Sequence, residues 1–132
     1  MALTHRVSST VRSNAGSVTS TSYTITGTHE FNLEKAFAIG TDVAQDLEAD
    51  QSTIVSLAME WDGVGSCTIE TNSSSAADDT IVLEDGKPLI WNTQIEETLG
   101  TVCPITVDIT TGIFVTNAGA GDLSIYILFN GS

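Results

Sequence analysis

The stretch that decides the fold class is STIVSLAMEW at residues 52–61, followed by Asp62-Gly63 and then by VGSCTIET at residues 64–71. Apolar and polar side chains alternate on both sides of the Asp-Gly pair. This is the pattern of two β-strands joined by a tight turn. We therefore predict a β-hairpin over this stretch.

The side chains also predict the register of that hairpin. A three-residue loop that ends in a left-handed Gly63 would set Leu57 opposite Cys67 and Val55 opposite Ile69. A two-residue turn would instead set apolar side chains opposite polar ones. We therefore expect the longer loop, with these four apolar side chains in the core.

Short apolar runs separated by turn residues continue along the chain, and they indicate an all-β fold. Further strands are expected at residues 18–26, 38–43, 80–83, 88–91, 102–110, 113–116 and 123–129. The strands at 80–83 and 88–91 should meet across an Asp-Gly turn, and the last strand, apolar on both faces, should be central. Polar loops are expected at residues 72–79, 92–101 and 117–122, while residues 29–51 fit helix and strand equally well. About eight short strands predict an antiparallel β-sandwich or jelly roll.

The length of the chain predicts a single folded unit. With 132 residues and no long linker, it can bury one core without disulfides or a metal. Residues 1–14 are sparse in apolar side chains and are expected to form an N-terminal arm or edge strand. Residues 15–132 are expected to form a single β-sandwich domain.

The charge of the chain argues against two classes of partner. Seventeen acidic residues stand against four basic ones, which are Arg6, Arg12, Lys35 and Lys87. Neutralising phosphates requires clustered Lys and Arg, so neither a nucleic acid nor an anionic membrane is an expected partner. Residues 1–20 lack the apolar segment of a signal peptide, and synthesis in the cytoplasm is expected.

No combination of residues indicates catalysis. The two histidines, His5 and His29, have no GxSxG motif nearby and are expected to be ordinary surface residues. Adjacent acids at 78–79, 84–85 and 96–97 should be solvated, and the acids between 42 and 50 lack the spacing of an EF-hand. We therefore expect no enzyme activity, no catalytic residue, no metal and no cofactor.

Both cysteines and Trp91 are expected to be buried in the core, whereas Trp61 is expected in a loop. Cys67 and Cys103 lack the spacing of a zinc or redox motif, and two buried thiols are expected, with a disulfide between them as the open alternative. Trp91 should anchor the core. Trp61, in the predicted loop, is the one plausible platform for a sugar.

Four motifs carry a family resemblance over residues 71–129. They read Thr71-Asn72-Ser73-Ser74, Asp78-Asp79-Thr80-Ile81, Gly86-Lys87-Pro88-Leu89-Ile90-Trp91 and Phe114-Val115-Thr116-Asn117. They resemble a group of small β proteins encoded in the structural gene clusters of tailed phages. The resemblance implies a virion component, most simply a head decoration (cement) protein that binds the major capsid protein on the outside of the capsid. It transfers no catalytic residue.

This resemblance gives the N-terminal arm a role to test. Many decoration proteins act as trimers at symmetry axes, so a homotrimer is expected. The arm carries Arg6 and Arg12, and we hypothesise that it contacts an acidic capsid surface, with a frayed terminus as the alternative. Two other functions stay open: a tail or head-fibre protein that binds a host glycan, and a bacterial carbohydrate-binding or adhesion module.

Overall fold

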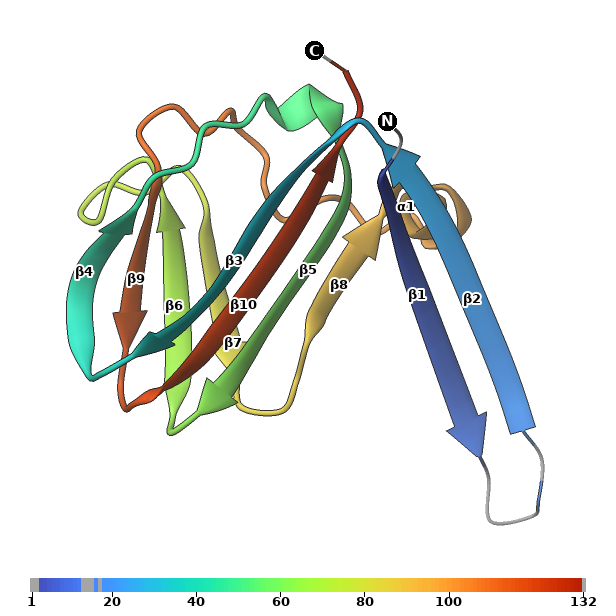
Figure 1. The fold of residues 1–132 in the computed structure, drawn as a ribbon, viewed down its shortest axis with the longest axis horizontal. Helices are drawn as coiled ribbons and strands as arrows, with labels where there is room; N and C mark the ends of the chain where they lie inside the picture. Colours follow the sequence, from blue (N-terminus) through green and yellow to red (C-terminus); the bar gives the residue numbers. More distant parts are fainter. Residues whose placement is uncertain (1–2, 13–15, 17, 132) are drawn as a thin grey trace.

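The computed structural model describes residues 3–12, 16 and 18–131, and within them the chain is an antiparallel β-sandwich with an added hairpin (Figure 1). Sheet 1 has the strand order β3 (His29–Phe37), β10 (Gly121–Phe129), β5 (Ile54–Gly63) and β8 (Leu89–Asn92). Sheet 2 has the order β4 (Gly40–Gln45), β9 (Ile113–Asn117), β6 (Ser66–Thr71) and β7 (Thr80–Glu84). The predicted all-β sandwich is confirmed.

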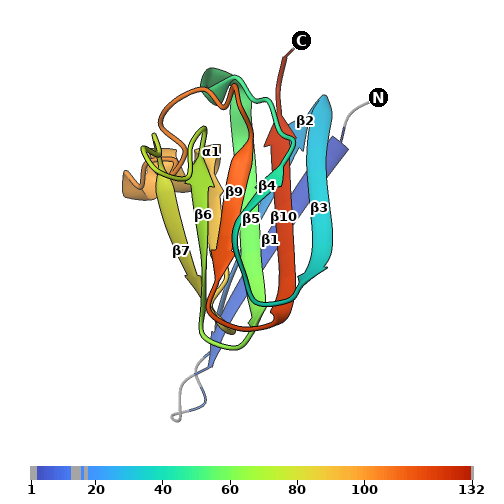
Figure 2. The ribbon, with the colours of Figure 1, turned by 90° about the vertical axis from the view of Figure 1, so that its left-hand side faces the viewer.

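Three smaller elements complete the fold. The hairpin consists of β1 (Leu3–Arg12) and β2 (Val18–Gly27), which pair only with each other. A 3-10 turn, η1 (Gln51–Thr53), precedes β5, and a short helix, α1 (Thr93–Leu99), follows β8. Seen from the side, the strands of sheet 2 lie beside those of sheet 1 (Figure 2).

The core lies between the two sheets because alternate residues of each strand point inward. Leu57, Trp61 and Ile125 of sheet 1 and Ile69 and Val115 of sheet 2 are fully buried. Strand β10 lies between β3 and β5, so the prediction of a central last strand is confirmed. Trp91 is also a core residue, and its indole Nε1 donates to the carbonyl oxygen of Thr101 at 2.9 Å.

The predicted hairpin over residues 52–71 is wrong. Strands β5 and β6 lie in different sheets, and Leu57 pairs with Ile127 rather than with Cys67. The left-handed glycine after β5 is Gly65, with φ +70°, and not Gly63. A crossing between sheets buries the same alternate side chains as a hairpin does, so the alternation identifies the buried face but not the paired strand.

The predicted position of Val55 in the core is also wrong. The register between β5 and β10 shifts between Leu128 and Phe129, which is a β-bulge near Val55. Ile54 takes the buried position and Val55 is partly exposed. A bulge moves the residues on one side of it to the opposite face of the sheet.

Two further sequence predictions fail for related reasons. Strands β7 and β8 do not pair across the Asp-Gly turn, because they too lie in different sheets. Residues 102–110 are irregular apart from a single bridge between Ala49 and Ile109, although Cys103, Ile105 and Ile109 are buried. Burial can alternate along an extended segment that lacks a neighbouring strand.

The predicted loop at residues 92–101 contains helix α1. The Asn92 side chain accepts a hydrogen bond from Ile95 N at 2.9 Å, and Gly100 ends the helix in a left-handed conformation. These are the preferred residues at the two ends of a helix.

Candidate functional site

The hairpin differs from the rest of the chain in charge. Residues 1–28 contain two arginines and no acid, for a formal charge of +2, whereas residues 29–132 contain two lysines and all 17 acids, for −15. Arg6 and Arg12 both lie in β1. The two arginines can be recognised from the sequence as a candidate contact, and the absence of acids around them becomes evident when charges are counted by segment.

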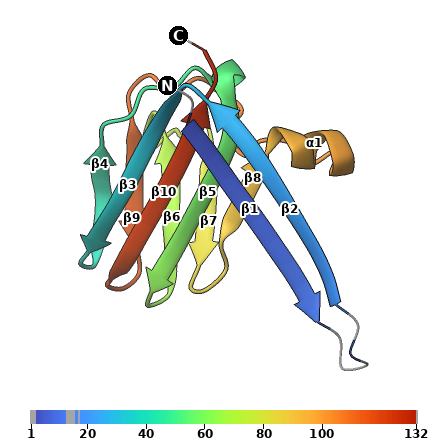
Figure 3. The ribbon, with the colours of Figure 1, turned by 45° about the vertical axis from the view of Figure 1, so that its right-hand side comes forward.

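The base of the hairpin packs on the outer face of sheet 1 (Figure 3). Ile25 of β2 and Leu128 of β10 are both buried there, outside the main core. At Gly27 an added Cβ would lie 2.5 Å from the carbonyl oxygen of Phe129, so only glycine permits this close approach. From this base the two strands run diagonally across the sheet and extend beyond the sandwich (Figures 1 and 3).

His5 connects the hairpin to two strands of sheet 1. Its Nδ1 lies 2.8 Å from Ser56 Oγ, and its Nε2 lies 3.6 Å from a carboxylate oxygen of Glu30. The order of serine, histidine and acid is that of a hydrolase triad, but Ser56 is only 1% exposed and no substrate can reach it. The arrangement therefore attaches the hairpin.

The two histidines differ from each other. The prediction of an ordinary surface residue is wrong for His5, whose side chain is 13% exposed. His29 is exposed, and its Nδ1 lies 3.0 Å from the hydroxyl of the adjacent Thr28.

The two arginines predicted to contact a capsid are placed differently. Arg6 is exposed on β1. The backbone of Arg12 ends β1, but its side chain lies outside the described residues. The docking hypothesis for this pair stays a prediction.

Adjacent acidic residues fasten loops in the sandwich. Asp79 accepts hydrogen bonds from the backbone N and the hydroxyl of Thr106, at 2.8 and 2.7 Å. Asp85 accepts one from Gly63 N at 3.1 Å. These carboxylates therefore have structural partners.

Both cysteines carry free, buried thiols, as predicted, and the alternative of a disulfide is not observed. Desolvation raises the pKa of the Cys67 thiol to about 11. Burial also raises the pKa of Cys103. Both thiols are therefore protonated and unreactive at neutral pH.

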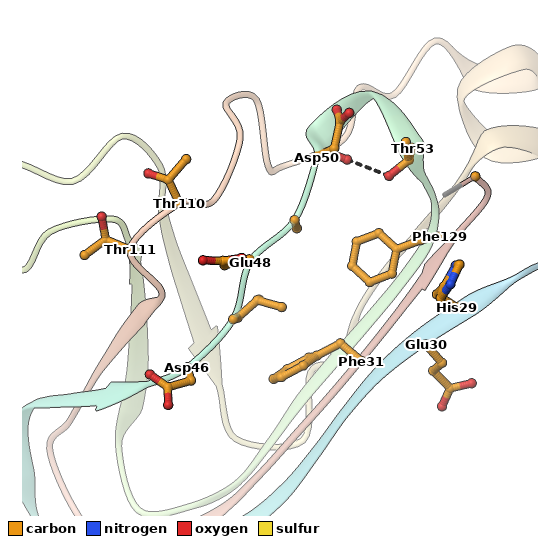
Figure 4. Close-up of a pocket in the computed structure, with 13 residues that line it drawn as sticks. His29, Glu30, Phe31, Asp46, Glu48, Asp50, Thr53, Thr110, Thr111 and Phe129 are labelled. Carbon is orange, nitrogen blue, oxygen red and sulfur yellow. Dashed lines mark hydrogen bonds between the residues drawn. The ribbon is translucent and has the colours of Figure 1, made fainter.

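A hollow of about 650 Å³ opens where the ends of β3 and β10 lie near residues 46–50 (Figure 4). Phe31 and Phe129 line it and are partly exposed. Trp61, the predicted sugar platform, is fully buried, so that prediction is wrong. The aromatic surface at a concavity comes instead from these two phenylalanines.

Neither known proteins nor a metal-binding group among the described residues assigns a role to these surfaces. Comparison of the chain with protein-family models, curated proteins and solved structures gives no match. Within the described residues, no three His, Cys, Asp or Glu side chains are grouped so as to hold a metal ion. No helix in this part of the chain is long and apolar enough to cross a membrane. The hairpin and the hollow are the two surfaces of the described residues that we consider further.

Proposed function

We propose that the chain is a structural protein of a tailed-phage particle that decorates the outside of the capsid and attaches through the hairpin β1–β2. The observation that carries this proposal is the hairpin itself, a basic element whose described buried contacts with the strongly acidic body lie at its base. The sequence resemblance to phage virion proteins supplies the identity of the particle.

Two properties suit the hairpin to attachment. Its arginines have no neighbouring acid in the sequence, so an acidic partner surface would attract the hairpin while repelling the rest of the chain. Strands β1 and β2 pair only with each other, so the outer edge of each strand can form backbone hydrogen bonds to a partner. Trimerisation would multiply such contacts at a symmetry axis.

The test uses the four basic residues as two matched pairs. Purified capsids of the phage whose genome encodes this chain, prepared without it, would be mixed with the wild type, with Arg6→Glu/Arg12→Glu, or with Lys35→Glu/Lys87→Glu. Both variants change the net charge equally. We expect the arginine variant to bind at least about tenfold more weakly, and the lysine variant to stay within about threefold of the wild type.

Each failure has its own meaning. Absence of wild-type binding to these capsids would reject the decoration function. Equal loss in the two variants would show that total charge, rather than the hairpin, controls binding. Loss of self-association by the arginine variant, with capsid binding unchanged, would assign the hairpin to contacts between copies of the chain.

A further inference from the structure

The hollow beside β3 has an apolar half and an acidic half (Figure 4). Phe31 and Phe129 lie on one side (Figure 4), and they pack against the core cluster that includes the buried Leu47, which also lines the hollow. Both side chains belong to strands of sheet 1, and they pack against the core while remaining partly exposed. This half of the hollow is an apolar surface that the chain leaves partly uncovered.

The other half carries unpaired carboxylates. Asp46 and Glu48 are exposed and make no hydrogen bond or ion pair with the described part of the chain, and Thr110 and Thr111 lie beside them. Asp50 differs, because its carboxylate accepts from Ser52 N at 3.0 Å and caps η1. Two carboxylates therefore remain available to a ligand.

The described lining of the hollow contains no lysine or arginine. The two lysines of the sandwich have other contacts: Lys87 pairs with Glu84, and Lys35 lies 5.2 Å from the centre of the Phe37 ring. His29 is the one basic residue at the rim. The hollow thus combines negative charge with aromatic surface and lacks a cation from the described chain.

We propose that this hollow binds the side chain of an arginine or lysine of a partner protein. The methylene stem would lie against Phe31 and Phe129, and the cation would face Asp46 and Glu48. Long basic side chains bury their stems on apolar surface while their charged heads pair with carboxylates or aromatic faces. The volume of about 650 Å³ accommodates such a side chain with its flanking backbone.

This site is independent of the hairpin and selects the opposite charge. The hairpin presents arginines to an acidic surface, whereas the hollow presents carboxylates to a basic one. One partner surface with both charges, or two partners, would satisfy both sites. Failure of either test leaves the other unaffected.

The experiment is an NMR titration of the full chain at low ionic strength with the peptide acetyl-Gly-Ala-Arg-Ala-Gly-amide. The control peptide replaces arginine with citrulline, which has nearly the same shape and no charge. We expect saturable shifts confined to the backbone amides of residues 29–31, 46–50, 110–111 and 129. The citrulline peptide should bind at least about fivefold more weakly.

Two isosteric variants test whether the site or the total charge attracts the peptide. Asp46→Asn/Glu48→Gln should weaken binding of the arginine peptide about fivefold. Glu70→Gln/Asp122→Asn removes equal charge from residues outside the hollow, and should leave the affinity within about twofold. Equal weakening in both variants, or shifts spread over the whole surface, would overturn the proposal.

The same NMR experiment also tests whether the hollow binds a second copy of the chain. Without peptide, concentration-dependent shifts at the same amides that disappear in Arg6→Glu/Arg12→Glu would identify the occupant as the hairpin of a second copy. That result would overturn the assignment to a partner protein.

Discussion

The sandwich and the hairpin are held in place by different means. The sandwich buries side chains such as Leu57 and Ile125 between two sheets, whereas the hairpin has no second sheet and rests on Ile25 and Leu128 at its base. The sandwich carries all 17 acids and the hairpin none. The stability of the core and the proposed attachment therefore depend on separate parts, and a change in one part should leave the other largely intact.

The largest expected effect tests the sandwich side of this comparison. Trp61→Ala should lower the free energy of unfolding by about 3–5 kcal/mol, because the fully buried indole leaves a cavity between the sheets. Urea denaturation followed by circular dichroism measures this loss. Thr24→Ala, at an exposed position of β2, should change it by less than about 0.5 kcal/mol. A small loss for Trp61→Ala would mean that the sheets reclose around the gap.

A second effect concerns pH and again comes from the sandwich. The pKa of Cys67 is raised to about 11 in the folded chain, from an ordinary value of 9.0. The folded state binds this proton more tightly, so the stabilisation is complete below pH 9 and is lost as the pH rises through about 11. The loss attributable to this thiol should approach about 3 kcal/mol.

Cys67→Ala provides the control for that pH dependence. It should be less stable than the wild type at pH 8 but should lose less stability between pH 8 and 11. Identical pH profiles for the two proteins would contradict the role of the Cys67 thiol. Urea denaturation at each pH, under reducing conditions, gives both profiles.

A third effect tests how closely the sandwich is packed. Gly121 of β10 pairs with Gly63 of β5, and an added Cβ on Gly121 would lie 2.6 Å from Gly63 Cα and 2.7 Å from the Trp61 ring. Gly121→Ala should therefore cost about 1–3 kcal/mol through overpacking. Asp122→Ala, at the exposed neighbouring position, should cost less than about 0.5 kcal/mol. Equal stability of Gly121→Ala and the wild type would show that β5 and β10 separate without cost.

The packing of the two sheets explains which parts of the fold the sequence predicts and which it does not. Alternation located most strands correctly, because each strand has one buried face. It failed on strand partners, because the turns after residues 63 and 84 lead to the opposite sheet with the same alternation. Helix α1 was missed although Asn92 and Gly100 are recognisable caps, because the segment was interpreted from its polarity alone.

The two candidate sites also differ in how much of each can be recognised from the sequence. The hairpin is contiguous in sequence, but Arg6 and Arg12 mark only its first strand. Residues 18–26 are expected from the sequence as a strand of the sandwich, whereas the structure pairs them with β1. The hollow draws on residues near 30, 47, 110 and 129, which only the folded sheets bring together. No local pattern marks Phe31 and Phe129 as partly exposed, since alternation alone assigns both to the buried face.

Ile25→Ala should have the smallest effect on the sandwich, and it tests the difference between hairpin and sandwich most directly. This substitution removes most of a buried side chain at the base of the hairpin, where the hairpin packs on sheet 1. If the hairpin opens separately, the free energy of its local opening should fall by about 2 kcal/mol, and its amides should exchange about 30-fold faster. The midpoint of urea unfolding of the sandwich should change little, because its core loses no contact between the sheets.

Hydrogen exchange resolved by residue measures both parts in one sample. We expect faster exchange throughout β1 and β2, with the amides of β5 and β10 nearly unchanged. Ser56→Ala, which removes the partner of His5 Nδ1, should have the same pattern with a smaller amplitude, because one hydrogen bond contributes about 1 kcal/mol. Equal acceleration in β1 and β10 would show that the hairpin and the sandwich open as one unit, and the separation of attachment from stability would then be wrong.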